Sequence, residues 1–437
     1  MKTITIVLVS ALLFSGSLLT GSDQVPGARQ ERPIALVGGT IHPMSGAEIP
    51  NGQILFVDGR IVELGVRVNI PPGAEVVDVA GKHIYPGFIA AHCILGLVEV
   101  GAVRATRDQS EVGEVNPNVR VERSYNPDSE HIPVARANGV ALAHVVPEGG
   151  RLSGTSAVMM LDGWTWEEAL LRGGVGVWLS WPDMVPIERP WITKTREEQE
   201  QEIQRNLQRL DEVFDQAEAY HRSKVAGGAE LKADLRWEGL EPVLEGRVPL
   251  FIRANHVSQI TAAINWTRRR GYEMVLVGGR DCWMVSDLLK EHDIPVIVGD
   301  IHTLPGRRWE AYDASFTLPA KLWAAGVKFC LSPTNSDYNV RNLPFEAGTA
   351  VAFGLPREEA LKAITLYAAR ILGIDHKTGS LEPGKDATML VTSGDPLDFR
   401  SEVEQLYIQG RKVDLGSRHK TLYEKYLERH RQLGIAP

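Results

Sequence analysis

The sequence predicts an α/β fold, a TIM-like (β/α)8 barrel with a small β unit beside it. Apolar strand-like runs alternate with helical patterns from His83 to Gly373, and near-continuous apolar strands are typical of a parallel sheet buried on both faces. Short β-branched segments separated by Gly, Pro, Asn and Asp occur before and after this region. The 437 residues are enough for eight strand-helix units and a second small unit.

The first residues have the layout of a secretory signal peptide. Lys2 precedes an apolar run from Ile4 to Thr20, and polar residues follow at Ser22 and Asp23. We therefore predict a signal peptide over residues 1–25 and export to the periplasm. An uncleaved N-terminal anchor is the alternative, because the run is at the short limit for a membrane-spanning helix.

The β unit is predicted from hairpin signals at both ends of the remaining chain. Asp58-Gly59 separates two β-branched runs between residues 34 and 79, which is a strong signal for a two-residue hairpin turn. From Gly379 the same pattern of short β-branched segments and turn residues occurs again, with a turn at Gln409-Gly410. We expect residues 34–80 and 380–413 to form one β unit that packs and has no catalytic residue.

The barrel strands are expected where apolar runs recur. A long amphipathic helix is predicted over 193–224, a polar loop at 105–128 should lie over the barrel mouth, and a helix over 417–433 should cover the fold or a neighbouring subunit. After a first strand beginning at Phe88, the strand-like runs are 140–147, 175–182, 248–255, 273–279, 294–300 and 327–333.

Composition excludes some partners. The net charge is −8 and basic runs are missing from the sequence, which argues against nucleic-acid or anionic-membrane binding. The three cysteines are too few for a disulfide framework and are interpreted as small buried hydrophobes: Cys93, Cys282 and Cys330.

The most informative stretch is KHIYPGFIAAHCILGLVE, Lys82 to Glu99. A short apolar run from Phe88 to Ala91 ends on His92, and a buried imidazole needs a polar partner. The run YPGFIAAH resembles the amidohydrolase superfamily, in particular its imidazolonepropionase-like branch, in which the pattern continues as His-x-His. In this chain Ile94 stands at the second histidine position.

The resemblance implies an organisation and an activity. It implies a composite β-sandwich domain from 26–82 and 374–415, an amidohydrolase barrel over 83–373 and a C-terminal helix over 416–437. It also implies a hydrolase of non-peptide C-N bonds, in which a bound metal activates water and an aspartate takes the proton.

Most of the metal ligands that the resemblance implies are replaced. By position, Ile94, Val177, Asn255 and Gly278 stand where the family has ligands, and His92 is the surviving ligand. At the eighth strand Asn335 or Thr334 occupies the position of the catalytic base. We therefore expect no dinuclear metal centre of the family type, because these side chains offer too few strong donors.

A relocated site is the alternative, since several polar residues fall at or just past predicted strand ends. A single divalent metal such as Zn could be bound there by histidines and aspartates. The catalytic candidates are Asn335 and Asp337, and the substrate-pocket candidates are Asn255, His256, His144 and His302. The relocated metal set is His92, His144, His256, Asp300, His302 and Asp337.

Three functional hypotheses follow. The first is an exported amidohydrolase-family hydrolase whose metal centre is lost or rebuilt, acting on a small-molecule substrate. The second is a catalytically inactive barrel that binds or scaffolds, as a homo-oligomer or as a hetero-oligomer with a related active amidohydrolase. The third is a metal-free hydrolase using a His-Asp couple, for which the sequence reveals no nucleophile.

Overall fold

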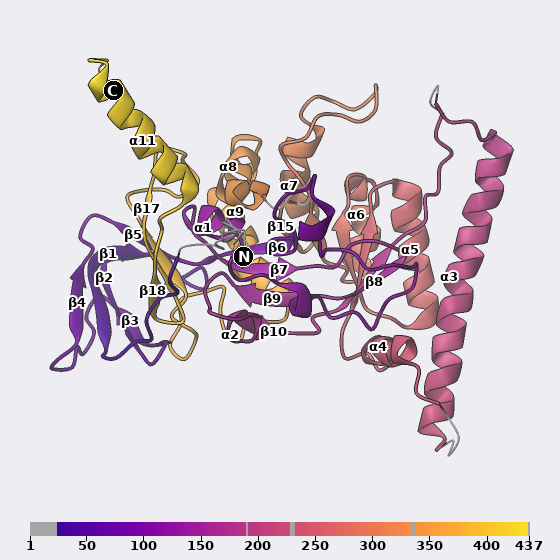
Figure 1. Ribbon diagram of the computed structural model, residues 1–437, viewed down its shortest axis with the longest axis horizontal. Helices are drawn as coiled ribbons and strands as arrows, with labels where there is room; N and C mark the ends of the chain where they lie inside the picture. Colours follow the sequence, from indigo (N-terminus) through magenta and orange to yellow (C-terminus); the bar gives the residue numbers. More distant parts are fainter. Residues whose placement is uncertain (1–23, 189–190, 228–231, 334–337, 436–437) are drawn as a thin grey trace, which may run out of the picture.

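The computed structural model describes residues 24–188, 191–227, 232–333 and 338–435 (Figure 1). The predicted signal peptide lies outside the described residues except for its last two positions, and the candidates Asn335 and Asp337 also lie outside them. In the described ranges, every helix is too short or too polar to cross a bilayer.

An eight-stranded sheet combines strands from both ends of the chain (Figure 1). Its order is β18-β17-β16-β5-β1-β2-β3, with β4 paired to β1. The strands of both ends are therefore joined in one hydrogen-bonded sheet with its own apolar cluster, and the β-sandwich arrangement stays a prediction. The strands are β1 (Ile34–Ile41), β2 (Ile49–Val57), β3 (Arg60–Gly65), β4 (Glu75–Asp78), β5 (His83–Pro86), β16 (Met389–Thr392), β17 (Val403–Ile408) and β18 (Arg411–Val413).

The β2–β3 hairpin is confirmed at the predicted turn. Val57 pairs with Arg60, and Asp58 and Gly59 have φ values of 49° and 76°. Positive φ at both central residues is the requirement of the turn that matches strand twist, which explains the Asp-Gly pair.

The central region contains two further sheets. One has the order β10-β9-β7-β6 and the other β15-β14-β13-β12-β11-β8, and β11 to β15 pair in parallel throughout. The strands are β6 (Phe88–Cys93), β7 (Val140–Val145), β8 (Leu152–Thr155), β9 (Ala157–Met160), β10 (Leu170–Arg172), β11 (Val177–Ser180), β12 (Leu250–Ala254), β13 (Met274–Gly278), β14 (Val296–Val298) and β15 (Phe329–Leu331).

One segment differs from the all-parallel prediction. The residues 152–160 form β8 and β9, which pair antiparallel to β11 and to β7 respectively. The short connection after β7 causes this reversal, because a parallel crossover needs a dozen or more residues. Gly149 and Gly150 have φ values of 86° and 65°, a conformation in which the chain turns back sharply.

Helices cover the central sheets, and α3 and α11 lie at opposite ends of the molecule (Figure 1). The predicted long helix is present as α3, and α11 has no buried residue. The helices are α1 (His131–Arg136), α2 (Trp166–Ala169), α3 (Arg196–Val225), α4 (Leu235–Leu244), α5 (Val257–Arg270), α6 (Ser286–Glu291), α7 (Ala314–Ala325), α8 (Leu343–Ala352), α9 (Arg357–Ala363), α10 (Leu366–Ile371) and α11 (Arg418–Gln432).

Helix α3 is amphipathic and is fixed to α5. Thr195 and Glu198 form a capping box at its first turn, which satisfies two N–H groups that would otherwise lack partners. Phe214 meets Trp266 of α5 edge to face at 4.8 Å. Arg270 of α5 also forms ion pairs with three acidic side chains of α3.

The polar loop 105–128 does not contribute to the cavity described below. It lies along β8 and the residues before it, through bridges of Ser110 to Glu148, Val115 to Leu152 and Arg120 to Thr155. The backbone bonds of this loop are therefore directed to the antiparallel segment.

Candidate functional site

A cavity of about 540 Å³ lies at the carboxyl ends of β12, β13 and β14. Ligand sites of α/β proteins are expected at this edge, where loops following parallel strands meet. Its lining includes His92 from β6, and its outer wall comes from the segment 303–315 and from α7. The strand-end lining residues are Arg253, Asn255, Val277, Gly278, Gly299 and Asp300.

His92 is the deeply buried polar residue of this cavity. It is 2% exposed, and its Nδ1 has no hydrogen-bond partner among the described residues. Its backbone N–H donates to Ser332 Oγ at 2.9 Å, and that hydroxyl donates to the His92 carbonyl at 3.0 Å. Burial lowers the pKa of His92 to about 3, helped by the positive charge of Arg253, so the imidazole is neutral at pH 7.

Aromatic rings occupy the space beside His92. Trp178 of β11 lies with its ring centre 4.9 Å from the His92 ring and stacks on Phe251 at 5.2 Å. Val177, at the expected position of a bridging ligand, is completely buried in the core. On this side of His92, the β11 residues Val177 and Trp178 therefore supply no side chain that could bind a metal together with the imidazole.

His144 is a structural residue in the core. Its Nδ1 lies 2.8 Å from the Ala91 carbonyl, so Nδ1 carries the proton, and Nε2 accepts the Ser156 hydroxyl at 2.7 Å. Burial lowers its pKa to about 4. Both ring nitrogens are engaged, and His144 does not line the cavity.

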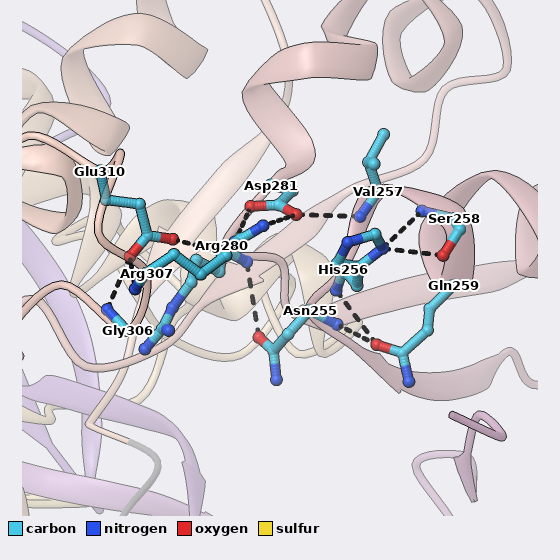
Figure 2. Close-up of polar contacts among 10 residues, drawn as sticks. All are labelled: Asn255, His256, Val257, Ser258, Gln259, Arg280, Asp281, Gly306, Arg307 and Glu310. Carbon is cyan, nitrogen blue, oxygen red and sulfur yellow. Dashed lines mark hydrogen bonds and ion pairs between the residues drawn. The ribbon is translucent and has the colours of Figure 1, made fainter. Parts of the chain in front are cut away.

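His256 caps a helix (Figure 2). Its Nδ1 accepts the Ser258 N–H at 3.2 Å, while Gln259 Oε1 accepts the His256 N–H at 3.0 Å, which is a capping box at the start of α5. His302 is exposed and its Nε2 lies 2.8 Å from Thr349 Oγ1. Neither side chain lines the cavity.

Asn255 lies in the cavity and fills the place of a β13 side chain. Its Oδ1 accepts the Arg280 N–H at 3.4 Å (Figure 2). Gly278 has φ of 88°, and a Cβ built on it would lie 2.5 Å from Asn255 Oδ1. A histidine at 278 would therefore be strained and would collide with Asn255.

The loop beside the cavity is fastened by an ion-pair network, which Figure 2 shows. Arg307 bonds to both oxygens of Asp281 and, through Nε, to Glu310 at 2.7 Å. Asp281 also accepts the Val257 N–H at 3.0 Å, and Glu310 accepts the Gly306 N–H at 2.6 Å. The bond to Asp281 raises the pKa of Arg307, so its guanidinium is charged at neutral pH.

The described side chains do not fit a dinuclear metal centre. In the described ranges, no three His, Cys, Asp or Glu side chains come together closely enough to hold an ion. Of the relocated set, the structure places His92 and Asp300 in the cavity and holds His144, His256 and His302 elsewhere. The guanidinium of Arg253 near His92 would also repel a cation. That the protein binds no such centre stays a prediction.

Sequence reasoning missed two kinds of residue. Arg253, near the end of β12, and Arg280, just after β13, both line the cavity, and an arginine at a strand end was the available signal. Glu346 of α8 is 3% exposed, and burial raises its pKa to about 7, with Asp300 adding to the effect. A glutamate in an apolar helical pattern was the available signal.

The chain is similar in sequence to proteins named as amidohydrolases and deaminases. The family model described as "Amidohydrolase family" matches residues 348–414. The chain is 20% identical over 431 residues to "Amidohydrolase tasK" of Hapsidospora irregularis and 23% identical over 393 residues to "Adenine deaminase 4" of Rhizobium meliloti. It covers 42% and 56% of these relatives, so it spans about half of their length, while 91% and 86% of this chain are matched.

A solved amidohydrolase of Thermotoga maritima is similar over most of this chain. It is 28% identical, with a TM-score of 0.77, over 87% of this chain and 99% of that one. Molinate hydrolase, 17% identical with a TM-score of 0.53 over 90% and 96% of the two chains, shares the fold. The chain belongs to the amidohydrolase superfamily. The narrower imidazolonepropionase-like assignment stays a prediction.

Proposed function

We propose that this superfamily member binds a small organic molecule in the cavity at the ends of β12, β13 and β14, without a dinuclear metal centre. The observation that carries the proposal is that His92 lines the cavity and that its buried Nδ1 has no partner among the described residues. Leaving such an atom unpaired costs about 1–3 kcal/mol, which a bound ligand can recover. The cavity volume is typical of small-molecule sites.

The barrel is part of this proposal. We infer that the two central sheets together form one barrel, with the segment 152–160 contributing to both. The bonds between His92 and Ser332 support this, because they join the strand β6 to the end of β15. In such an arrangement the cavity lies at the barrel mouth, where sites of this architecture occur.

Hydrolysis of a non-peptide C-N bond is the second candidate. It is favoured by the similarity, over most of this chain, to a protein named amidohydrolase and to one named adenine deaminase. The buried carboxyl group of Glu346 has a pKa near 7, which suits proton transfer at neutral pH, although Glu346 does not itself line the cavity.

The experiment is a fragment screen by ligand-observed NMR on the purified protein, together with elemental analysis. We expect fragments to bind competitively at one site, and a His92→Phe variant to lose them. A matched His302→Phe variant should keep them, because that side chain lies outside the cavity. About two metals per chain, lost on His92→Ala, would contradict the proposal.

Location and assembly are proposed on the sequence. We infer export to the periplasm. Mass spectrometry of the native protein in a periplasmic fraction would test this, and a mature chain that lacks Met1 and the apolar run after it is the expected result.

We also propose assembly as a homo-oligomer or with a related amidohydrolase. The support is α11, which has no buried residue and carries exposed Leu422 and Tyr426. Light scattering of the purified protein would test it.

A further inference from the structure

We propose that the cavity recognises a small organic acid, whose carboxylate is bound by Arg253 and Arg280 with His92 as a hydrogen-bond partner. This rests on the proposed function, that the cavity binds a small molecule, and adds the chemical class of the ligand.

The first support is uncompensated positive charge. Arg253, Arg280 and Lys321 all line the cavity, and within the described residues none of them forms an ion pair with a carboxylate. The ammonium group of Lys321 lies 5.0 Å from the centre of the Trp283 ring, which holds it toward the cavity without neutralising it. A planar guanidinium presents paired N–H donors that match a carboxylate.

The second support is that the neighbouring acids are already bound. Asp281 and Glu310 also line the cavity, but both pair with Arg307, and each accepts at least one backbone N–H. Their charge is therefore directed at Arg307 and the backbone. Asp300 is the other lining carboxylate, so the three cavity cations exceed the acids that Arg307 does not hold.

The third support is His92, which lines the cavity. It is 2% exposed and its Nδ1 has no hydrogen-bond partner among the described residues, so this nitrogen can donate to a ligand oxygen. Arg253 lines the same cavity. One carboxylate in the cavity can therefore contact the Arg253 guanidinium and the His92 imidazole together.

The rest of the cavity suits an apolar body. Trp283, Trp309, Leu304 and Leu318 line it, and Trp309 is held by the Arg307 guanidinium 4.6 Å from its ring centre. Apolar walls with a few fixed polar groups are the usual composition of small-molecule sites. The ligand class is therefore an aromatic or branched aliphatic carboxylic acid.

The experiment uses acids and their uncharged amides as probes on the full protein. A series of alkanoates and arylalkanoates from acetate to 4-phenylbutyrate, each with its carboxamide, is titrated by ligand-observed NMR and by thermal shift. We expect at least one arylalkanoate to bind about tenfold or more tightly than its amide, since a hydrogen bond to a charged group is worth more than a neutral one. Its affinity should fall as salt rises.

Variants locate the charge. Arg253→Gln and Arg280→Gln should each lose about tenfold of the acid affinity without changing amide binding, and Arg253→Lys should keep part of it. Lys328→Gln, which removes an exposed cation at the opposite ends of the strands, should leave both unchanged. Circular dichroism and melting temperatures confirm that the variants fold.

The outcomes separate this inference from the proposed function. Amides that bind as tightly as acids, or acid binding that survives both arginine substitutions, would overturn the charge assignment and leave small-molecule binding standing. A screen in which neither acids, amides nor other fragments bind would overturn both.

Discussion

Glu346 is predicted to destabilise the protein increasingly as pH rises. The side chain is 3% exposed and accepts a hydrogen bond from the Ile301 N–H at 3.3 Å, while Asp300 adds a like charge nearby. Burial is the main cause that raises its pKa from 4.5 to about 7. The folded protein therefore holds a proton on Glu346 in a pH range in which the unfolded chain has already released it.

The sign and the size follow from proton linkage. The stability contributed by a raised pKa is fully present below pH 4.5 and is lost as pH rises through about 7. Each pH unit between the two pKa values is worth about 1.4 kcal/mol, so the loss approaches about 3 kcal/mol by pH 8. Glu346→Gln cannot ionise and keeps an oxygen that can accept the Ile301 N–H.

The assay is urea unfolding of the wild type and of Glu346→Gln between pH 4.5 and 8. The two proteins should be similar near pH 4.5, and the variant should be about 3 kcal/mol more stable by pH 8. Glu197→Gln, at an exposed position of α3, is the matched control and should show no such trend. A stability difference that stays flat across this range would refute the assignment of a raised pKa to Glu346.

Three other perturbations have defined outcomes. Arg136→Leu removes one of the two arginines paired with buried Asp162 and leaves Arg411, so it should cost about 1.5–3 kcal/mol in urea unfolding, and less when combined with Asp162→Asn. Gly176→Ala places a Cβ against the Phe251 ring, too close for van der Waals contact, and should lower stability by about 1–3 kcal/mol, seen as a lower melting temperature. Because the pKa of His144 is lowered to about 4, wild-type stability should fall as pH drops below 6.5, and His144→Gln should weaken that dependence in acid titration.

The sequence predicted elements where local rules act alone. The Asp58-Gly59 turn needs a specific backbone conformation, and α3 carries its own cap and apolar stripe, so both were found with little error. The antiparallel orientation of 152–160 was missed, because an apolar strand pattern is the same for parallel and antiparallel pairing. The short loop before this segment decides its orientation.

The candidate site was predicted less well, for a physical reason. Resemblance aligns positions along strands, but it does not say which way a side chain turns. His144 engages both ring nitrogens, and His256 and His302 each engage one, with partners outside the cavity that the positions of strand ends do not reveal. His92 was placed correctly at a strand end, while the arginines beside it were overlooked because the family pattern directed attention to metal donors.

The sheet shared by the two ends of the chain has a consequence for biosynthesis. β5 pairs with β16, His83 opposite Thr392, so the edge of β5 stays unpaired until the chain has been synthesised beyond Thr392. During translation, β1 to β5 leave the ribosome with the β5 edge unpaired, and that edge stays available to other chains until β16 is made. A nascent chain that stalls before β16 is therefore exposed to strand exchange and aggregation, and a cell gains by keeping it bound to a chaperone until the C-terminal strands arrive.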